Sequence, residues 1–267
     1  MARLDAELVR RGLARSRGEA RELVEAGQVT VQGRVLRKAA APVGPDTDLV
    51  VADDGPRWVG RAAHKLDHAF AQWEPDGLTA TGRRCLDVGA STGGFTQVLL
   101  HRGAEHVVAL DVGRDQLVAG LREDPRVTER SGTSIRDATA DELGTFDLVV
   151  ADLSFISLTL VLEAIAGLTR AGGDVVVLVK PQFEVGRGRL SKNGLVTDPR
   201  HRRRALTGVV TAAGEAGLGL HGLIRSPITG GEGNTEYLLW GRSGVSGTMD
   251  PDAVHAAVRD LAREGRA

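Results

Sequence analysis

The spacing of hydrophobic residues in this 267-residue chain follows one pattern before residue 60 and a different pattern after it. In the first segment, apolar residues at helical spacing predict two helices, near residues 4–9 and 16–27. Ser16 and Glu19 have the spacing of a capping box at the start of the second helix. Short alternating stretches then predict small strands near 29–31, 35–36 and 49–51, so this segment should form a helix pair on a small sheet.

Beyond residue 60, short apolar runs alternate with helical patterns. The runs predict seven strands, near 84–88, 106–110, 127–130, 146–151, 175–179, 220–224 and 237–240. The run at 146–151 is almost wholly apolar, which is typical of a parallel strand covered on both faces. We therefore predict an α/β fold with a mostly parallel seven-stranded sheet, preceded by a small α+β domain. Residues 181–199 show little periodicity and are predicted to form a mobile loop.

Glycine, proline and four aspartates gather in residues 46–60, and this change of composition predicts a domain boundary. We place the domains at 1–55 and 61–245, with a linker at 56–60. A C-terminal segment, 246–267, contains an amphipathic helix that Asp250 should cap, and we assign no function to it.

The net charge of −1 conceals two basic stretches. Residues 1–45 hold nine Lys and Arg against five Asp and Glu, and residues 180–204 hold eight against two. Such stretches favour a polyanionic partner, although a solvated charged face is the alternative. Around the turn between the first two helices, guanidinium groups could bind phosphates through paired hydrogen bonds, and these candidates are Arg10, Arg11, Arg15, Arg17 and Arg21.

Other features bear on cofactors and compartment. The one cysteine, Cys85, lies in a predicted buried strand, and no histidine has a spacing from it that is typical of a metal site, so we expect no metal. No apolar run approaches the roughly 18 residues of a membrane helix, and the N-terminus lacks the core of a signal peptide. We therefore expect a cytoplasmic protein with no membrane partner.

A turn of small residues, 89–94, connects the strand at 84–88 to a helix that begins near Phe95. Glycines allow positive φ and close approach of a bound molecule, and the helix directs free amides towards it. About twenty residues later a second strand ends in Asp111, where a carboxylate could hold a ribose diol. The spacing of Gly89 and Gly93 differs from the dinucleotide pattern, which favours S-adenosylmethionine because that molecule has no pyrophosphate. An ordinary tight connection is the alternative.

Charged residues follow two further strands, with Asp152 after 146–151 and Lys180 after 175–179. Ligands of open α/β sheets bind beyond the carboxyl ends of the strands, so these side chains should meet Gly89 and Asp111 along one edge. Without further information, Asp152 could equally cap the following helix, and Lys180 could be solvated.

Four motifs of the second segment are distinctive as sequences: Gly89-Ala90-Ser91-Thr92-Gly93-Gly94-Phe95, Ala151-Asp152-Leu153-Ser154-Phe155-Ile156-Ser157, Val179-Lys180-Pro181-Gln182-Phe183-Glu184 and Gly233-Asn234-Thr235-Glu236-Tyr237. Through these motifs the chain resembles the TlyA family of ribosomal RNA methyltransferases, also called hemolysin A, and the resemblance runs from residue 1 to about 242. The N-terminal segment resembles the S-four RNA-binding module through Arg3-Leu4-Asp5, Gly12-Leu13-Ala14-x-Ser16-Arg17 and Gly27-Gln28-Val29-Thr30-Val31-Gln32-Gly33.

The resemblance implies an N-terminal RNA-binding module, a Rossmann-like methyltransferase domain, and 2′-O-methylation of cytidine in ribosomal RNA. Ribosomal RNA or ribosomal subunits are then the partners, and S-adenosylmethionine is the methyl donor. The family's Lys-Asp-Lys-Glu catalytic pattern falls on Lys65, Asp152, Lys180 and Glu236. The predicted donor site consists of Gly89, Ala90, Ser91, Gly93, Asp111 and Phe155. Near the adenine, where the family commonly has Asn, this chain has Ser134.

A ribose 2′-hydroxyl is a poor nucleophile at neutral pH, so the site must remove or steer its proton. Lys180 is our candidate for that role, because burial or a nearby second cation such as Lys65 would favour a neutral amine. Asp152 and Glu236 should orient the lysines and the ribose. The alternatives are an RNA-binding accessory protein, a pore-forming hemolysin, and a pseudouridine synthase with the same RNA module. A pore needs a membrane-spanning pattern, which the sequence does not show.

Overall fold

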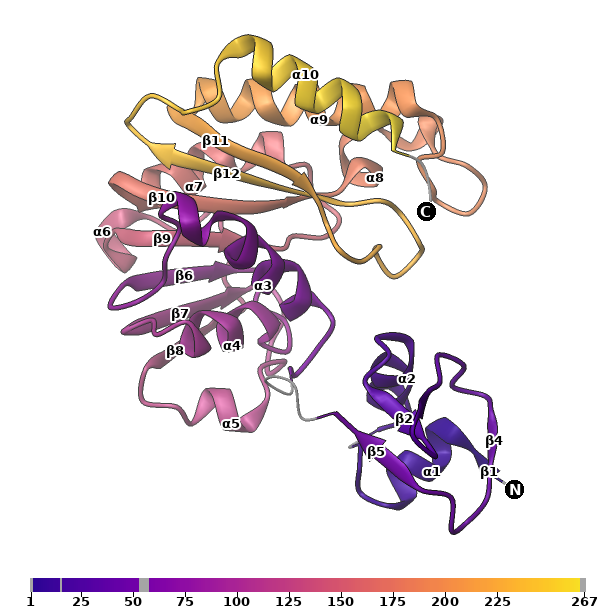
Figure 1. Ribbon diagram of the computed structural model, residues 1–267. Helices are drawn as coiled ribbons and strands as arrows, with labels where there is room; N and C mark the ends of the chain where they lie inside the picture. Colours follow the sequence, from indigo (N-terminus) through magenta and orange to yellow (C-terminus); the bar gives the residue numbers. More distant parts are fainter. Residues whose placement is uncertain (1, 15, 53–57, 265–267) are drawn as a thin grey trace. The chain divides into compact units, whose positions relative to one another are not determined.

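The chain divides into two compact units, Met1–Arg61 and Ala62–Ala267 (Figure 1). The computed structural model describes residues 2–14, 16–52 and 58–264. Residues 56 and 57 of the predicted linker lie outside the described residues, and so does Arg15.

The N-terminal unit contains the helix pair and the small sheet that the sequence predicts. Helices α1 (Leu4–Arg10) and α2 (Arg17–Glu25) pack against each other, and Ser16 caps α2 by accepting a hydrogen bond from the Glu19 amide at 3.2 Å. An antiparallel sheet has the order β3-β2-β5, formed by Arg34–Val35, Val29–Val31 and Leu49–Val51. The sequence does not predict the pairing of β1 (Ala2–Arg3) with β4 (Pro42–Val43), because two-residue strands are too short to show alternation.

The second unit contains one seven-stranded sheet in the order β11-β12-β10-β9-β6-β7-β8. Its strands are β6 (Arg84–Val88), β7 (His106–Asp111), β8 (Val127–Ser131), β9 (Phe146–Ala151), β10 (Thr169–Val179), β11 (Leu218–Arg225) and β12 (Tyr237–Ser243). Strands β10, β9, β6, β7 and β8 pair in parallel, while β12 runs antiparallel to both β10 and β11. The predicted mostly parallel seven-stranded sheet is therefore confirmed. The strand order reverses between β6 and β9, because the chain leaves β6 for β7 and returns on its other side.

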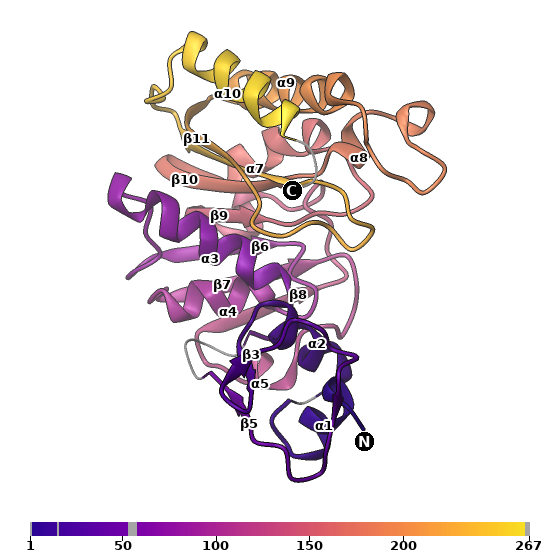
Figure 2. The same cartoon turned by 45° about the vertical axis from the view of Figure 1, so that its right-hand side comes forward.

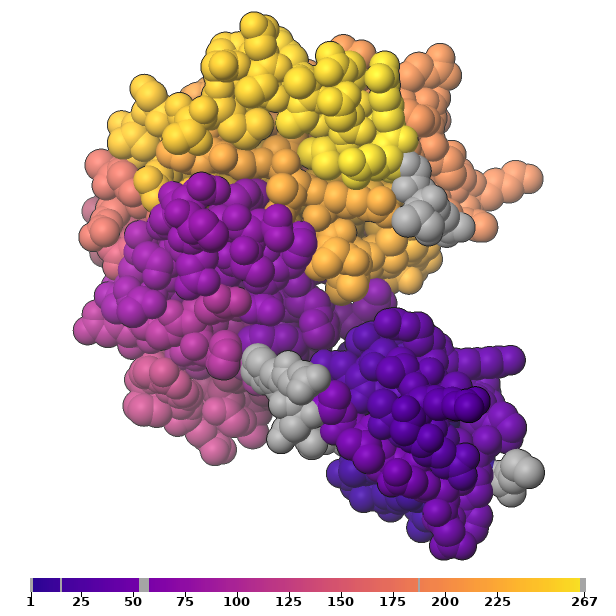
Figure 3. Space-filling view, in the orientation of Figure 1, coloured from indigo at the N-terminus to yellow at the C-terminus, as the bar shows by residue number. Residues whose placement is uncertain are grey.

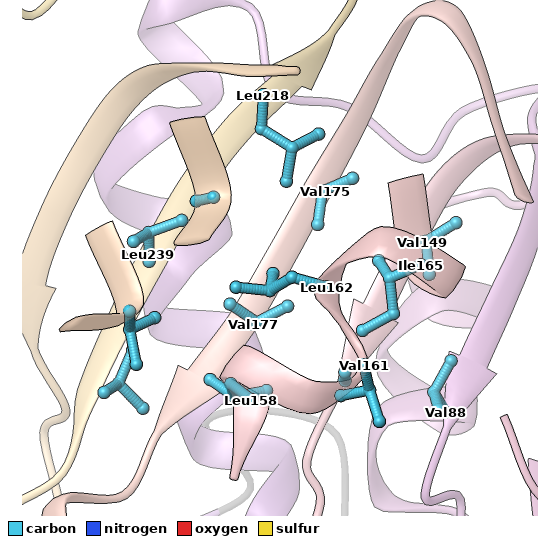
Figure 4. Packing of buried hydrophobic residues seen from close by; sticks show 14 of the residues in the cluster. Val88, Val149, Leu158, Val161, Leu162, Ile165, Val175, Val177, Leu218 and Leu239 are labelled. Carbon is cyan, nitrogen blue, oxygen red and sulfur yellow. The ribbon is translucent and has the colours of Figure 1, made fainter. Parts of the chain in front are cut away.

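Helices cover both faces of this sheet (Figure 2). On one face, α4 (Gly94–His101) contacts β6 and β7, and α3 (Ala62–Trp73) packs against α4. On the other face, α7 (Leu162–Leu168) contacts β9, β10 and α9 (Pro199–Glu215). Figure 4 shows Val175 and Val177 of β10 close to Leu162 of α7 in the core of this second face. Burial on both faces explains why β10 and β9 read as continuous apolar runs.

The segment 181–199, which the sequence predicts as a loop, contains α8 (Pro181–Glu184) and the 3₁₀ helix η3 (Arg187–Arg189). Val185 and Val196 from this segment are buried with Ala205 of α9, and two isolated valines are too few to show a periodicity. Asp250 caps α10 (Pro251–Arg263) as predicted, by accepting a hydrogen bond from the Ala253 amide at 2.8 Å. Helix α10 packs on α9 and β11 and forms an outer layer of this unit, yellow in Figure 3. The remaining short helices are η1 (Glu74–Asp76), α5 (Ala119–Arg122), α6 (Ala140–Leu143) and η2 (Leu158–Leu160).

Candidate active site

The carboxyl ends of four neighbouring parallel strands carry the residues that the sequence predicts to meet. Gly89 follows β6, Asp152 follows β9 and Lys180 follows β10, while Asp111 is the last residue of β7. Strands β6 and β9 flank the point where the strand order reverses, and ligands of such sheets bind in the crevice at this position. The structure therefore brings these residues to one edge.

The turn after β6 has a backbone that depends on glycine at two positions. Gly89 has a φ of +86°, and a Cβ atom built there would lie 2.7 Å from the carbonyl oxygen of Asp152. Gly93 caps α4 with a φ of +100°, and a Cβ atom there would lie 2.3 Å from a methyl carbon of Leu121. Gly89 thus lets β6 and β9 approach closely at the crevice, whereas Gly93 lets the turn pack on the Leu121 side chain.

A cavity of about 480 Å³ opens beside this turn. Four of the six predicted donor-binding residues line it, namely Gly89, Ser91, Asp111 and Phe155. Ala90 and Gly93 do not line it; they shape the turn behind it. Its lining also includes residues that the sequence does not single out, among them Gln116, Thr133, Ser154 and Ile156, together with Ser134 at the expected adenine side.

The Asp111 carboxylate is fixed by two backbone amides. Its Oδ2 accepts a hydrogen bond from Ser91 N at 2.8 Å, and its Oδ1 accepts one from Gly113 N at 2.7 Å. Each carboxylate oxygen has a further lone pair, so Asp111 can still accept hydrogen bonds from a ligand's hydroxyls.

Two lysines and two carboxylates form a buried ion cluster. Lys65 Nζ lies 2.7 Å from Glu236 Oε2 and 3.6 Å from Asp152 Oδ2. Lys180 Nζ lies 2.6 Å from Asp152 Oδ1 and donates a hydrogen bond to Ser154 Oγ at 2.9 Å. Asp152 therefore bridges the two lysines, and the structure brings together all four residues of the Lys-Asp-Lys-Glu pattern.

These four side chains come from four separate elements of the second unit. Lys65 lies on α3, Asp152 and Lys180 follow β9 and β10, and Glu236 directly precedes β12. Glu236 is 2% exposed, and a Cβ atom at Gly230 would lie 2.4 Å from its Oε1. The backbone at Gly230 therefore confines this carboxylate on the side opposite Lys65.

A loop beside the cluster presents an aromatic side chain to solvent. Phe155 is 91% exposed with a φ of +64°, a strained conformation for a bulky residue, and its ring centroid lies 5.3 Å from that of Phe183. Glu184 holds this loop by accepting hydrogen bonds from Ser157 Oγ at 2.5 Å and Leu158 N at 2.9 Å. Burial raises the pKa of Glu184, and these two hydrogen bonds oppose that shift.

Ser154 and Glu184 are site residues that the sequence patterns do not predict. Both stand inside the quoted motifs, Ser154 two residues after Asp152 and Glu184 four residues after Lys180. Their proximity to the charged motif residues was the signal that could have found them.

The predicted arginine cluster of the N-terminal unit is partly occupied by contacts within that unit. Arg10 and Arg11 both bind Glu7, and Arg17 Nη2 lies 3.3 Å from Asp5. Arg11 also donates hydrogen bonds to the carbonyl oxygens of Thr47 and Pro45, both at 2.7 Å, so its guanidinium holds a loop. Hydrogen bonds from Arg10 and Arg11 lower the pKa of Glu7 to about 2. Arg10, Arg17 and Arg21 are exposed, and Arg15 lies outside the described residues.

None of the helices that the structure describes is long and apolar enough to cross a bilayer. Among the described residues, no group of three or more His, Cys, Asp or Glu side chains is arranged to hold a metal ion.

Two protein families match separate parts of the chain. The FtsJ-like methyltransferase family matches residues 58–243, and the S4 domain matches residues 2–49. The chain is 50% identical to the 16S/23S rRNA (cytidine-2′-O)-methyltransferase TlyA of Mycobacterium tuberculosis strain H37Rv, over 97% of this chain and 98% of that protein. It is 37% identical to Hemolysin A of Brachyspira hyodysenteriae, over 88% of this chain and 98% of that protein.

A solved structure has a similar fold over nearly the whole chain. The "Putative hemolysin" from Streptococcus thermophilus superposes with a TM-score of 0.72 at 36% identity, covering 97% of this chain and 94% of that chain. Three observations agree with the names of the sequence relatives. The Lys-Asp-Lys-Glu cluster is buried beside a cavity at the strand ends. The methyltransferase family matches the second unit, and the S4 domain matches the first. The chain belongs to the TlyA family of FtsJ-like methyltransferases that carry an N-terminal S4 domain.

Proposed function

We propose that the protein transfers the methyl group of S-adenosylmethionine to the 2′-hydroxyl of cytidine in ribosomal RNA. The observation that carries this proposal is the ion cluster of Lys65, Asp152, Lys180 and Glu236, which is buried at the edge of a cavity where a methyl donor would bind. The TlyA relative from Mycobacterium tuberculosis has this activity in its name and shares half of its residues with this chain.

The cavity suits S-adenosylmethionine in shape and in polar groups. Its volume of about 480 Å³ falls within the usual range for small-molecule sites. Asp111 can accept hydrogen bonds from the ribose diol of the donor, and Gly89 lines the cavity without a side chain of its own. Thr133 and Ser134 offer hydroxyls at the adenine side. The donor supplies an electrophilic methyl group on a sulfonium. The protein binds the donor and supplies the groups that act on the hydroxyl.

Lys180 acts on the attacking hydroxyl in one of two forms. As the neutral amine it takes the hydroxyl proton while the oxygen bonds to the methyl carbon and the bond from that carbon to sulfur breaks; as the ammonium it polarises the hydroxyl. Lys180 is the reactive amine in this proposal, because it contacts Asp152 and Ser154, which both line the cavity. Asp152 holds both lysines by bridging them, and Glu236 holds Lys65 at 2.7 Å. The near-complete burial of the cluster strengthens each of these electrostatic interactions.

The N-terminal unit supplies affinity for RNA in this proposal. Its exposed arginines, Arg10, Arg17 and Arg21, present guanidinium groups that can bind phosphate oxygens. Asp5 and Glu7 hold Arg10 and Arg17 from beneath, so these side chains are oriented before RNA arrives. Ribosomal RNA or a ribosomal subunit is the corresponding partner.

Two measurements test this function. Calorimetry should detect binding of S-adenosylmethionine to the protein, and mapping of 2′-O-methyl groups should find cytidines in ribosomal RNA that are modified only when the protein is present. A folded protein without donor binding would contradict the proposal and favour an RNA-binding accessory role.

A pair of glycine variants localises the donor site. Gly89→Ala places a methyl group against the Asp152 carbonyl and should weaken donor binding at least about tenfold, which corresponds to about 1.4 kcal/mol. Gly82→Ala is the matched control, because Gly82 also has a positive φ, +66°, but has no atom within 4 Å of the added Cβ. Equal donor affinity in the two variants would exclude the cavity beside Gly89 as the donor site.

A further inference from the structure

The C-terminal helix α10 lies beyond residue 243, where the methyltransferase family match ends, yet its last turn is tied to the segment that carries Glu236. Tyr237, the residue after Glu236, donates a hydrogen bond from its hydroxyl to the Leu261 carbonyl at 3.3 Å. Arg202 of α9 donates one from Nε to the Ala262 carbonyl at 3.1 Å. Two side chains thus bind the carbonyls that the end of α10 would otherwise leave without partners.

Arg202 joins this helix end to the segment between α8 and α9. Its Nη1 donates to the carbonyl oxygens of Val196 at 3.1 Å and Thr197 at 3.0 Å. The residue is 5% exposed, and no carboxylate in the described parts of the chain forms an ion pair with it. A buried guanidinium is therefore stabilised by three backbone carbonyls, one of them at a helix C-terminus, where the helix dipole favours a cation.

Asn234 links the segment between α8 and α9 to the part of the chain that carries Glu236. Its Oδ1 accepts a hydrogen bond from Val196 N at 2.9 Å, and its Nδ2 donates to the Gly194 carbonyl at 3.0 Å. Asn234 stands two residues before Glu236 and is 4% exposed. These hydrogen bonds and the backbone of residues 234–237 together form a closed ring. It runs from α10 through Arg202, Val196 and Asn234, along the chain to Tyr237, and back to α10.

We infer that Arg202 is a positioning residue that sets the Glu236 carboxylate against Lys65 by clamping residues 194–197 and the end of α10. The inference rests on the proposed role of Glu236 in methyl transfer. Arg202 lies outside the donor cavity and pairs with none of the four cluster residues, so its effect passes through the backbone of residues 234–237. Glu236 has no spare room, because Gly230 packs against one oxygen and Lys65 binds the other.

The size of the effect follows from the demands of in-line transfer. A displacement of about 1 Å at a reacting group can cost on the order of a hundredfold in rate. Arg202→Lys keeps the positive charge but cannot reach three carbonyls in a fork, so the ring should open while the charge stays. The variant should lower kcat about tenfold or more, leave the Kd for S-adenosylmethionine within about threefold, and speed amide hydrogen exchange at Val196.

A double-mutant cycle with Glu236→Gln separates positioning from general loss of structure. If Arg202 acts through Glu236, Arg202→Lys should lower kcat far less in the Glu236→Gln protein than in the wild type. Arg259→Lys is the matched control, since Arg259 is an exposed arginine on α10, paired with Asp260, and should leave kcat and exchange at Val196 unchanged.

Each outcome decides the inference. Additive losses in the cycle, unchanged kcat in Arg202→Lys, or a donor Kd that weakens together with kcat would overturn it. If Arg202→Lys fails to fold, Tyr237→Phe removes one hydroxyl from the same ring and should lower kcat about threefold, again without additivity to Glu236→Gln. Absence of methyl transfer by the wild-type protein would instead refute the proposed function, so the two failures are distinguishable.

Discussion

The two units each bury charged side chains, but they assemble them in different ways. In the N-terminal unit, Glu7 of α1 binds Arg10 and Arg11, three and four residues further along the chain and within reach of one helical turn. In the second unit, Lys65 binds Glu236 across 171 residues of sequence, and Asp152 and Lys180 come from different strands. The first cluster is a local device that holds arginines at the surface. The second cluster forms only after the sheet has formed. The packed sheet and helices can then keep a reactive site from water.

Two buried carboxylates of the N-terminal unit and one of the second unit have pKa values shifted in opposite directions. Hydrogen bonds from arginines lower the pKa of Glu7 to about 2 and also lower the pKa of Asp5. Burial raises the pKa of Asp87, in β6 beneath the glycine turn, to about 7. Thr96 donates a hydrogen bond to one oxygen of Asp87 at 2.7 Å, and no described residue donates to the other. The N-terminal unit therefore neutralises buried carboxylates with cations, whereas the site side of the sheet keeps one that favours its proton.

The largest expected effect concerns Lys180. Lys180→Ala should lower methyl transfer by at least about 10³-fold, because it removes the amine that we propose acts on the hydroxyl, while Lys180→Arg should fail as well because a guanidinium stays charged. Single-turnover kinetics measure the rate, and calorimetry serves as the internal control, with donor affinity within about threefold of the wild type. Near-wild-type turnover by the arginine variant would exclude Lys180 as the base and leave orientation as the source of rate.

The next effect is the pH dependence caused by Asp87. Between pH 3.8 and about 7 the folded protein holds this proton and the unfolded chain does not, so the free energy of unfolding should fall as pH rises through that window. The fall is at most about 4 kcal/mol, at 1.36 kcal/mol for each pKa unit. Denaturation followed by tryptophan fluorescence should show this component in the wild type and not in Asp87→Asn. A difference between the two proteins that is constant with pH would show that Asp87 ionises normally.

Removal of residues 1–55 tests whether the N-terminal unit binds RNA while the second unit binds the methyl donor. RNA affinity should fall on the order of 10- to 100-fold at physiological salt, and the dependence of log K on log salt should become shallower because phosphate contacts are lost. Donor binding should be unchanged, because every residue that lines the cavity lies in the second unit. Unchanged RNA affinity would place RNA recognition in the second unit.

The smallest effect is expected at Glu7. The folded-state pKa of Glu7 is lowered from 4.5 to about 2, so its stabilisation is present above pH 4.5 and is lost as pH falls towards 2. Glu7→Gln should therefore speed amide exchange in α1 at pH 7 and have less effect near pH 2. Glu25→Gln, at an exposed position on α2, is the matched control. A Glu7 effect that does not change with pH would mean that packing, not the arginine contacts, holds this side chain.

Much of the fold can be predicted from local patterns. Ser16 and Asp250 cap their helices as predicted, because a cap involves residues two or three positions apart. The apolar runs of β6, β7, β9 and β10 mark strands because a sheet covered on both faces requires them. The start of β10 at Thr169, α8 and the β1–β4 pairing were missed, because each depends on long-range contacts or on too few residues to show a period.

The sequence by itself determined the two-part organisation of the chain, the order of its strands and helices, and the residue types at the strand ends, since these follow from spacing and chain order. Only the tertiary structure decided which charges meet. In the folded protein, Lys65 of α3 contacts Glu236 and Asp152, and Arg11 donates a hydrogen bond to the Thr47 carbonyl of a loop. The Tyr237 hydroxyl donates a hydrogen bond to the Leu261 carbonyl at the end of α10. The reason is that ion pairs and hydrogen bonds between distant residues depend on distances that arise when strands and helices pack, and no local pattern encodes those distances.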